Sequence, residues 1–166
     1  PTPVGPTLAS LRILHVSDLH YSLPQLDWVV QAAPDFDLVV LSGDQLDISS
    51  PVPLDAQIAV ILEYLSLLHR AGKVVVSSGN HDLTGPDANG EQAALWLAEA
   101  RAAGIATDGA SLTVGDTLVT VCPWWDGPVG RDSVAAQLGR DAARRPERWV
   151  WVYHWPPAGS PTTWTG

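Results

Sequence analysis

The stretch LVVLSGD at residues 38–44 decides the fold. Its successive apolar residues are typical of a strand covered on both faces, as in a parallel sheet flanked by helices. Gly43-Asp44 ends this strand. Comparable runs lie at residues 11–16 and 74–77, and a helical pattern separates each run from the next. The first half of the chain is therefore predicted to be an α/β unit with a mainly parallel sheet.

Helical patterns fill the gaps between these strands. A short one covers residues 26–33, and a longer one opens at Pro53 and closes at Gly72, with apolar residues three and four positions apart. We expect a third helix over residues 91–103, with Gly104 as its stop signal. Strands and helices thus alternate up to residue 104.

The second half of the chain has a different pattern. Residues 111–114 and 117–122 flank Gly115-Asp116, which predicts a β-hairpin. Five of the nine basic residues follow between positions 131 and 148, and we expect a solvated helix there. A last strand over residues 149–153 leads into His154.

Length and composition limit the classes of protein. The 166 residues, 17.7 kDa in mass, suit one domain, and we expect a flexible lead over residues 1–10 and a folded domain over 11–166. A net charge of −9 disfavours nucleic acid as a bulk partner, because its binding needs surplus Lys and Arg. No apolar run is long enough to span a membrane, and the single Cys122 fits the reducing cytoplasm. The oligomeric state stays open.

Side chains that bind metal ions follow four of the predicted strands. In chain order they are Asp18 and His20, then Asp44, then Asn80 and His81, and finally His154. Because ligands bind at the carboxyl ends of the strands in open α/β sheets, we expect these residues to form one site.

The residue types and spacing suggest how the ligands are shared. Asp18 and His20 leave an extended backbone on the same side and can bind one cation together. Asp44 has two carboxylate oxygens and can bridge two cations, whereas Asn80 and His154 can bind the second. Mixed oxygen and nitrogen ligands favour Mn, Fe, Zn or Ni over Ca or Mg.

The order of these motifs resembles the calcineurin-like metallophosphoesterase superfamily over about residues 11–157. The family pattern of D-x-H, G-D-x-x-D, G-N-H-[DE] and a strand-terminal His is matched by residues 18–20, 43–47 and 79–82 and by His154. The resemblance implies a metallophosphoesterase-like α/β/β/α sandwich with two divalent transition-metal ions, Mn or Fe favoured. Asp18, His20 and Asp44 would bind one ion. Asp44, Asn80 and His154 would bind the other.

The resemblance also implies the chemistry. His81 would be the catalytic imidazole near the leaving group, and Asp82 would orient it. The enzyme would be a binuclear-metal phosphoric ester hydrolase that cleaves a phosphomonoester or phosphodiester with a metal-bridging hydroxide. A small-molecule phosphodiester is slightly preferred as substrate. A nuclease, or a non-catalytic scaffold of the same fold with an incomplete metal site, are the alternatives.

One family motif is missing from the sequence. The last block, G-H-x-H, does not occur in the 166 residues. We therefore expect the chain to continue beyond Gly166, with the C-terminal part of the second sheet and this motif. His15 and His69 are expected to be structural and not to replace it, because His15 should leave its strand on the face opposite Asp18.

Other residues allow two interpretations. Asp47 could support a metal ligand or cap the next segment, and the sequence favours neither. Trp124 and Trp125 suit a stacking platform for a base or an aromatic leaving group, although simple packing after a strand is favoured. Cys122 is expected to be a buried small hydrophobic residue.

Overall fold

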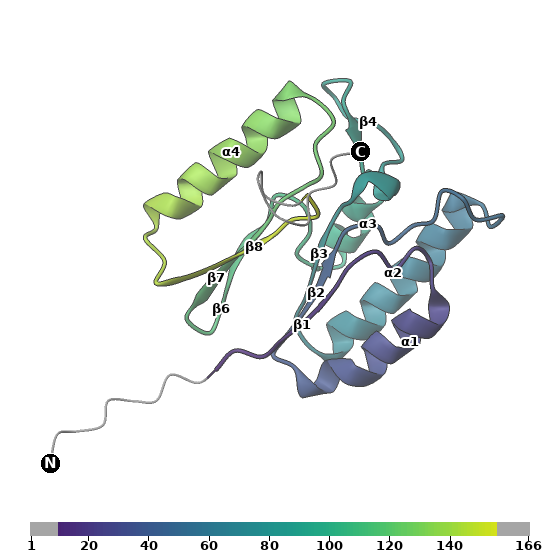
Figure 1. The fold of residues 1–166 in the computed structure, drawn as a ribbon, viewed down its shortest axis with the longest axis horizontal. Helices are drawn as coiled ribbons and strands as arrows, with labels where there is room; N and C mark the ends of the chain where they lie inside the picture. The colour runs from purple at the N-terminus through teal and green to yellow at the C-terminus, as the bar shows by residue number, and fades with distance from the viewer. Residues whose placement is uncertain (1–9, 156–166) are drawn as a thin grey trace, which may run out of the picture.

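The computed structural model describes residues 10–155. Figure 1 shows four layers, in which α1 and α2 cover one face of a first sheet, a second sheet lies on the other face, and α4 covers the outer side of that second sheet. The architecture is the α/β/β/α sandwich expected from the sequence. The predicted flexible lead over residues 1–10 lies, apart from Ser10, outside the described residues.

The first sheet contains three parallel strands in the order of the chain. They are β1 (Ile13–Val16), β2 (Leu38–Ser42) and β3 (Val74–Ser77). α1 (Leu23–Ala32), which leads into a 3-10 turn η1 (Ala33–Asp35), joins the first two strands, and α2 (Leu54–Ala71) joins the second two. All three strands fall where their apolar runs predicted them, within two residues at each end.

The second sheet combines the predicted hairpin with the last strand. β6 (Ser111–Val114) pairs antiparallel with β7 (Thr117–Val121), and β8 (Arg148–Val152) pairs parallel with β7. The connection is α4 (Pro128–Ala143). This helix attaches through polar groups, because Asp141 accepts hydrogen bonds from the hydroxyls of Ser111 and Thr120. The predicted solvated helix is confirmed, but it ends before three of the five arginines assigned to it.

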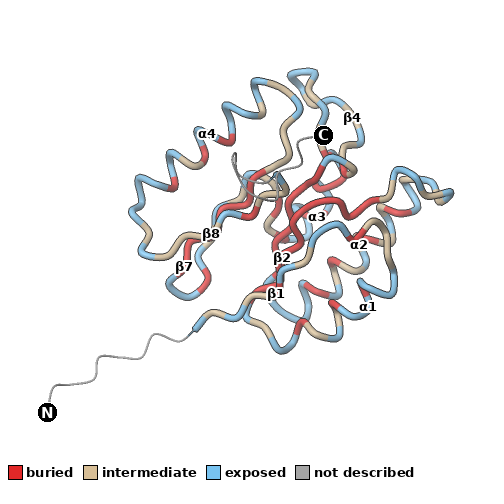
Figure 2. The backbone as a smooth tube through the Cα atoms, viewed as in Figure 1, coloured by how far each residue is buried: buried red, intermediate tan, exposed pale blue. Residues whose placement is uncertain are grey.

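The central strand β2 shows why its sequence is apolar at every position. Val39 and Leu41 pack with the helices on one side, while Leu38 and Val40 pack against β7 and β8 of the second sheet. Every residue of β2 is buried. Figure 2 shows that burial is concentrated along the strands and that the outer surfaces of the helices are exposed.

The helix predicted over residues 91–103 is largely wrong. The structure has two short strands, β4 (Gly85–Pro86) and β5 (Gln92–Ala93), and only a short helix, α3 (Leu97–Ala102). The side chain of Asp87 accepts the backbone N–H groups of Asn89 and Glu91 and so forms a turn. This local side-chain bonding competes with helix formation, which the apolar spacing alone does not reveal.

Glu91 also joins this hairpin to the second half of the chain. Its two carboxylate oxygens accept the N–H groups of Val129 and Gly130 in the first turn of α4, at 2.8 and 2.7 Å. These donors have no partner within the helix, and a carboxylate suits the positive end of the helix dipole. No helix among residues 10–155 is both long and apolar enough to cross a bilayer.

We predict that Glu91→Ala lowers the free energy of unfolding by about 1 kcal/mol, the usual cost of losing a side chain that caps a helix. Urea denaturation followed by circular dichroism measures the change. Gln92→Ala, at the exposed neighbouring position, is the control and should change stability by less than about 0.5 kcal/mol. Equal stabilities of the two variants would contradict the capping role.

Candidate metal centre

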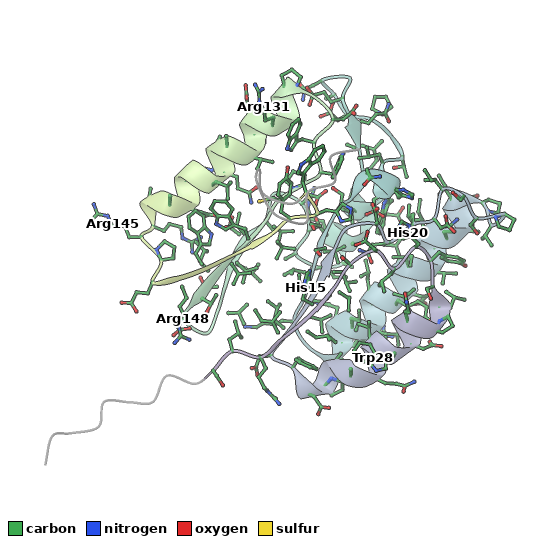
Figure 3. All side chains as sticks on the ribbon, in the orientation of Figure 1. His15, His20, Trp28, Arg131, Arg145 and Arg148 are labelled. Carbon is green, nitrogen blue, oxygen red and sulfur yellow. The ribbon has the colours of Figure 1, made fainter. Side chains whose placement is uncertain are left out.

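The loops that follow β1, β2, β3 and β8 meet at one end of the sandwich. β1, β2 and β3 are parallel and in register, so their carboxyl ends lie side by side. The N–H of Asp18 donates to the carbonyl of Gly43, and the N–H of His20 donates to that of Asp44, at 3.1 and 3.0 Å. Figure 3 shows His20 beyond the end of β1, past His15, which lies inside the strand.

Three of the predicted metal ligands have a left-handed backbone. Asp18, His20 and Asp44 have φ angles of 55, 43 and 56°, so the extended backbone expected at Asp18 and His20 is wrong. The left-handed conformation costs non-glycine residues about 1–3 kcal/mol each and persists only where the surrounding structure enforces it. The backbone bonds between the first two loops hold it in place here.

Two glycines allow the loops to approach closely. A Cβ atom at Gly43 would overlap the ring of His154, and one at Gly79 would overlap the carboxylate and backbone nitrogen of Asp44. Gly43 also has a φ of +88°, which favours glycine. The glycines of the G-D and G-N-H-D motifs therefore make room for the side chains of His154 and Asp44.

Asp82 holds two of the loops together from below. One carboxylate oxygen accepts the N–H groups of Asp44 and Gly79, and the other accepts those of Gln45 and Leu46, at 2.8 to 3.1 Å. The side chain is fully buried. Burial raises the pKa of Asp82 to about 7, against the effect of these donors, which favour the ionised form.

The side chains of Asp44 and its neighbours form two overlapping groups. One contains His20, Asp44 and His81, and the other contains Asp18, Asp44 and His154; within each group the candidate ligand atoms lie within 4.8 Å of one another. Asp44 Oδ2 lies 3.3 Å from His154 Nε2 and 3.8 Å from His20 Nε2. Asp44 is common to both groups, and each group also contains candidate ligands from other loops.

The ring of His154 is fixed by the backbone of β2. Its Nδ1 lies 2.8 Å from the carbonyl oxygen of Ser42, which leaves Nε2 directed at Asp44. The bond to Asp44 raises the pKa of His154 to about 9. Burial alone would raise the pKa of Asp44, but His154 and the N–H of His81 hold it below its ordinary value. The buried carboxylate of Asp44 thus stabilises a positive charge on the ring of His154.

His81 is placed differently from the expectation. Asp82 was expected to orient it, but the Asp82 carboxylate is occupied by backbone donors. His81 Nδ1 is buried without a hydrogen-bond partner among the described residues. The ring instead stands edge-on to that of His20, with the ring centroids 4.7 Å apart. A buried, unpaired ring nitrogen in a group of candidate ligands fits the binding of a cation or a substrate.

The remaining predicted residues lie as follows. Asn80 is exposed at the start of the short helix η2 (Asn80–Asp82), directly before His81. Of the two interpretations of Asp47, support of a metal ligand or capping of the next segment, the structure shows the second: its side chain accepts the N–H of Ser49 and so forms a turn. His15 Nε2 lies 2.6 Å from Ser42 Oγ inside the first sheet.

Sequence reasoning missed Gln45 and the carbonyl of Ser42. Gln45 is fully buried, and its amide donates to the carbonyl of Gly43. It occupies a variable position of the G-D-x-x-D motif, so the motif gave no signal for it. The Ser42 carbonyl is backbone and has no sequence signal at all. Gly43 and Gly79, by contrast, could have been recognised, because each directly precedes a candidate ligand.

The comparison with known families agrees with this geometry. The profile of the calcineurin-like phosphoesterase family matches residues 11–163. The chain belongs to this family. A search of curated proteins found no match to the chain. Members of the calcineurin-like phosphoesterase family hydrolyse phosphoesters with divalent metal ions, and the His and Asp groups of this chain fit such ions in their donor chemistry.

We predict that Asp82→Asn lowers the free energy of unfolding by about 3 kcal/mol. The amide would place an NH₂ group against two buried backbone N–H donors, and each unsatisfied donor costs about 1–3 kcal/mol. Urea denaturation of the metal-free protein at pH 8 measures this loss. Asp47→Asn, which alters only a surface turn, is the control. A loss below about 1 kcal/mol for Asp82→Asn would contradict the proposed role of the carboxylate in joining the loops.

Proposed function

We propose that the protein hydrolyses a phosphomonoester or phosphodiester with two divalent transition-metal ions, Mn or Fe favoured. The observation that carries this proposal is the position of Asp44, whose buried carboxylate is shared by the two groups of ligands. The direct test is elemental analysis of the purified full-length protein, together with hydrolysis of bis-p-nitrophenyl phosphate. A metal-free protein that stays inactive after reconstitution with Mn²⁺ would contradict the proposal.

The residues have distinct proposed roles. Asp18, His20, Asp44, Asn80 and His154 hold the metal ions, which when bound neutralise phosphoryl oxygens and lower the pKa of water. His154 keeps Nε2 available because its Nδ1 is occupied by the Ser42 carbonyl. His81 donates a proton or a hydrogen bond to the leaving oxygen. Asp82 keeps the loops of Asp44 and His81 in place through the backbone.

A catalytic site explains the strained backbone better than a scaffold does. Left-handed φ angles at Asp18, His20 and Asp44 cost stability without adding to the core. A non-catalytic scaffold would gain nothing from them. A small-molecule phosphodiester remains the preferred substrate over a nucleic acid, since a chain with net charge −9 has few cations to neutralise a polyanion. The buried free Cys122 is compatible with the proposed cytoplasmic location.

We predict that Asp44→Asn reduces bound transition metal more than His20→Ala does. Asp44 belongs to both ligand groups, whereas His20 belongs to one. Metal content per chain is measured by elemental analysis after dialysis against metal-free buffer. Asp47→Asn is the matched control because it removes a nearby carboxylate that belongs to neither group. Unchanged metal content in Asp44→Asn would show that Asp44 does not bridge.

The role of His81 can be tested separately from metal binding. His81→Gln should keep its metal ions but lose about 10²–10⁴ in rate on an alkyl diester, the usual effect of removing a general acid. The loss should be smaller with p-nitrophenol as leaving group, because this group needs little protonation. His69→Gln, at the exposed end of α2, is the control. Loss of metal in His81→Gln would make His81 a ligand of the group it shares with His20 and Asp44.

A further inference from the structure

Three tryptophans form an aromatic surface next to the metal centre. The ring centroid of Trp155 lies 4.6 Å from that of Trp124 and 5.9 Å from that of Trp125, and the rings of Trp125 and Trp155 are within 13° of parallel. We call these three residues the tryptophan shelf. Two of them come from the loop between β7 and α4, and the third follows directly after His154.

The shelf is joined to the metal centre at two points. The ring of Trp124 lies 5.7 Å from that of His154, measured between centroids. The backbone N–H of Trp124 donates to the hydroxyl of Ser78 at 2.9 Å, and Ser78 is buried directly before the Gly79-Asn80 segment. The position of the shelf relative to the candidate ligands is therefore fixed by bonds and ring contacts.

Exposure distinguishes the shelf from ordinary core packing. Trp96 is a core tryptophan, 5% exposed, and its Nε1 donates to the carbonyl of Asp82. Trp155 is 44% exposed although it packs on two other rings. Trp124 and Trp125 are partly exposed and line a cavity of about 220 Å³. The exposed part of this aromatic surface lies beside the candidate ligands and is available to a bound molecule.

The charges around the shelf determine which part of a substrate it can bind. The cavity that Trp124 and Trp125 line is also lined by Asp87, Glu91 and Asp126, and no Lys or Arg among residues 10–155 lines it. Figure 3 shows Arg131, Arg145 and Arg148 on the α4 side of the molecule, away from His20. A phosphate would be repelled by these carboxylates, so the shelf suits a neutral, flat group. The phosphoryl group would then lie at the metal ligands.

We infer that the tryptophan shelf binds a flat aromatic group, such as a nucleobase, of the phosphoester substrate, and that Trp155 is a specificity-determining residue. This inference rests on the proposed hydrolytic function. The aromatic group stacks on the exposed part of Trp155 while the phosphoryl group reaches the ligands around Asp44. Stacking of a base on an aromatic side chain contributes about 1–3 kcal/mol, which corresponds to roughly 5–150-fold in binding.

The test compares two substrates that share a leaving group. The p-nitrophenyl ester of thymidine 5′-phosphate carries a base, whereas ethyl p-nitrophenyl phosphate does not, and both release p-nitrophenol. In the Mn²⁺-loaded full-length protein, Trp155→Ala should raise KM for the nucleotide ester by about 5-fold or more and leave KM for the ethyl ester unchanged. Trp155→Phe should restore the lower KM. Trp151→Ala, at another exposed tryptophan, is the control.

A binding measurement separates failure of this inference from failure of the proposed function. Calorimetry with adenosine 5′-phosphate and ribose 5-phosphate needs no turnover, and the wild-type protein should bind the nucleotide more tightly, a preference that Trp155→Ala should abolish. If both esters are hydrolysed and Trp155→Ala changes KM equally for the two, stacking on the tryptophan shelf is wrong but the proposed hydrolase activity is not. If neither ester is hydrolysed but the protein still binds the nucleotide more tightly and Trp155→Ala removes this preference, the proposed hydrolase activity is wrong but stacking on the tryptophan shelf is not. Equal binding of the two phosphates would overturn the shelf.

Discussion

Asp82 lies fully buried beneath the candidate metal centre, and its two oxygens accept backbone N–H donors from the loops after β2 and β3. Without an acceptor, these donors would be buried and unpaired, at about 1–3 kcal/mol each. The carboxylate therefore fixes where Asp44 begins its loop and where Gly79 approaches it. The other candidate ligands are held against this loop, because the N–H groups of Asp18 and His20 bond to the backbone at positions 43 and 44 and the ring of His154 bonds to the carbonyl of Ser42.

This arrangement also explains how the chain keeps an unfavourable backbone at Asp18, His20 and Asp44. Left-handed φ angles are costly, and they persist where other bonds over-determine the conformation. The N–H groups of Asp18 and His20 are bound to the second loop, and the second loop is bound to Asp82. Strain in the ligand loops is thus offset by buried hydrogen bonds below them and by the apolar packing of β2 on both of its faces.

The sequence predicted most of the fold because β2 and its parallel neighbours have both faces covered, which leaves a strong apolar signal. It also predicted that Asp18, His20 and Asp44 lie close together, since parallel strands bring their carboxyl ends together. His154 joins them from the end of β8 in the second sheet. Three features depend on tertiary contacts and were not predictable from spacing. Asp82 bonds to backbone groups distant in sequence, Glu91 bonds to the start of α4, and Trp155 acquires its neighbours only when β8 lies beside β7.

The protein has a net charge of −9, yet its proposed substrate is an anion. These statements are compatible because charges on the surface are screened beyond about 8–10 Å at physiological salt, whereas a cation at Asp44 would act at contact distance. Attraction to phosphate is therefore local to the metal centre, and it is the same for every phosphoester. Discrimination must come from groups that do not touch the phosphate. The tryptophan shelf is uncharged, is fixed to His154 and Ser78, and is bordered by carboxylates that repel a second anion. In the proposed function, the phosphoryl group therefore lies at the candidate metal ligands and the neutral part of the substrate at the tryptophans.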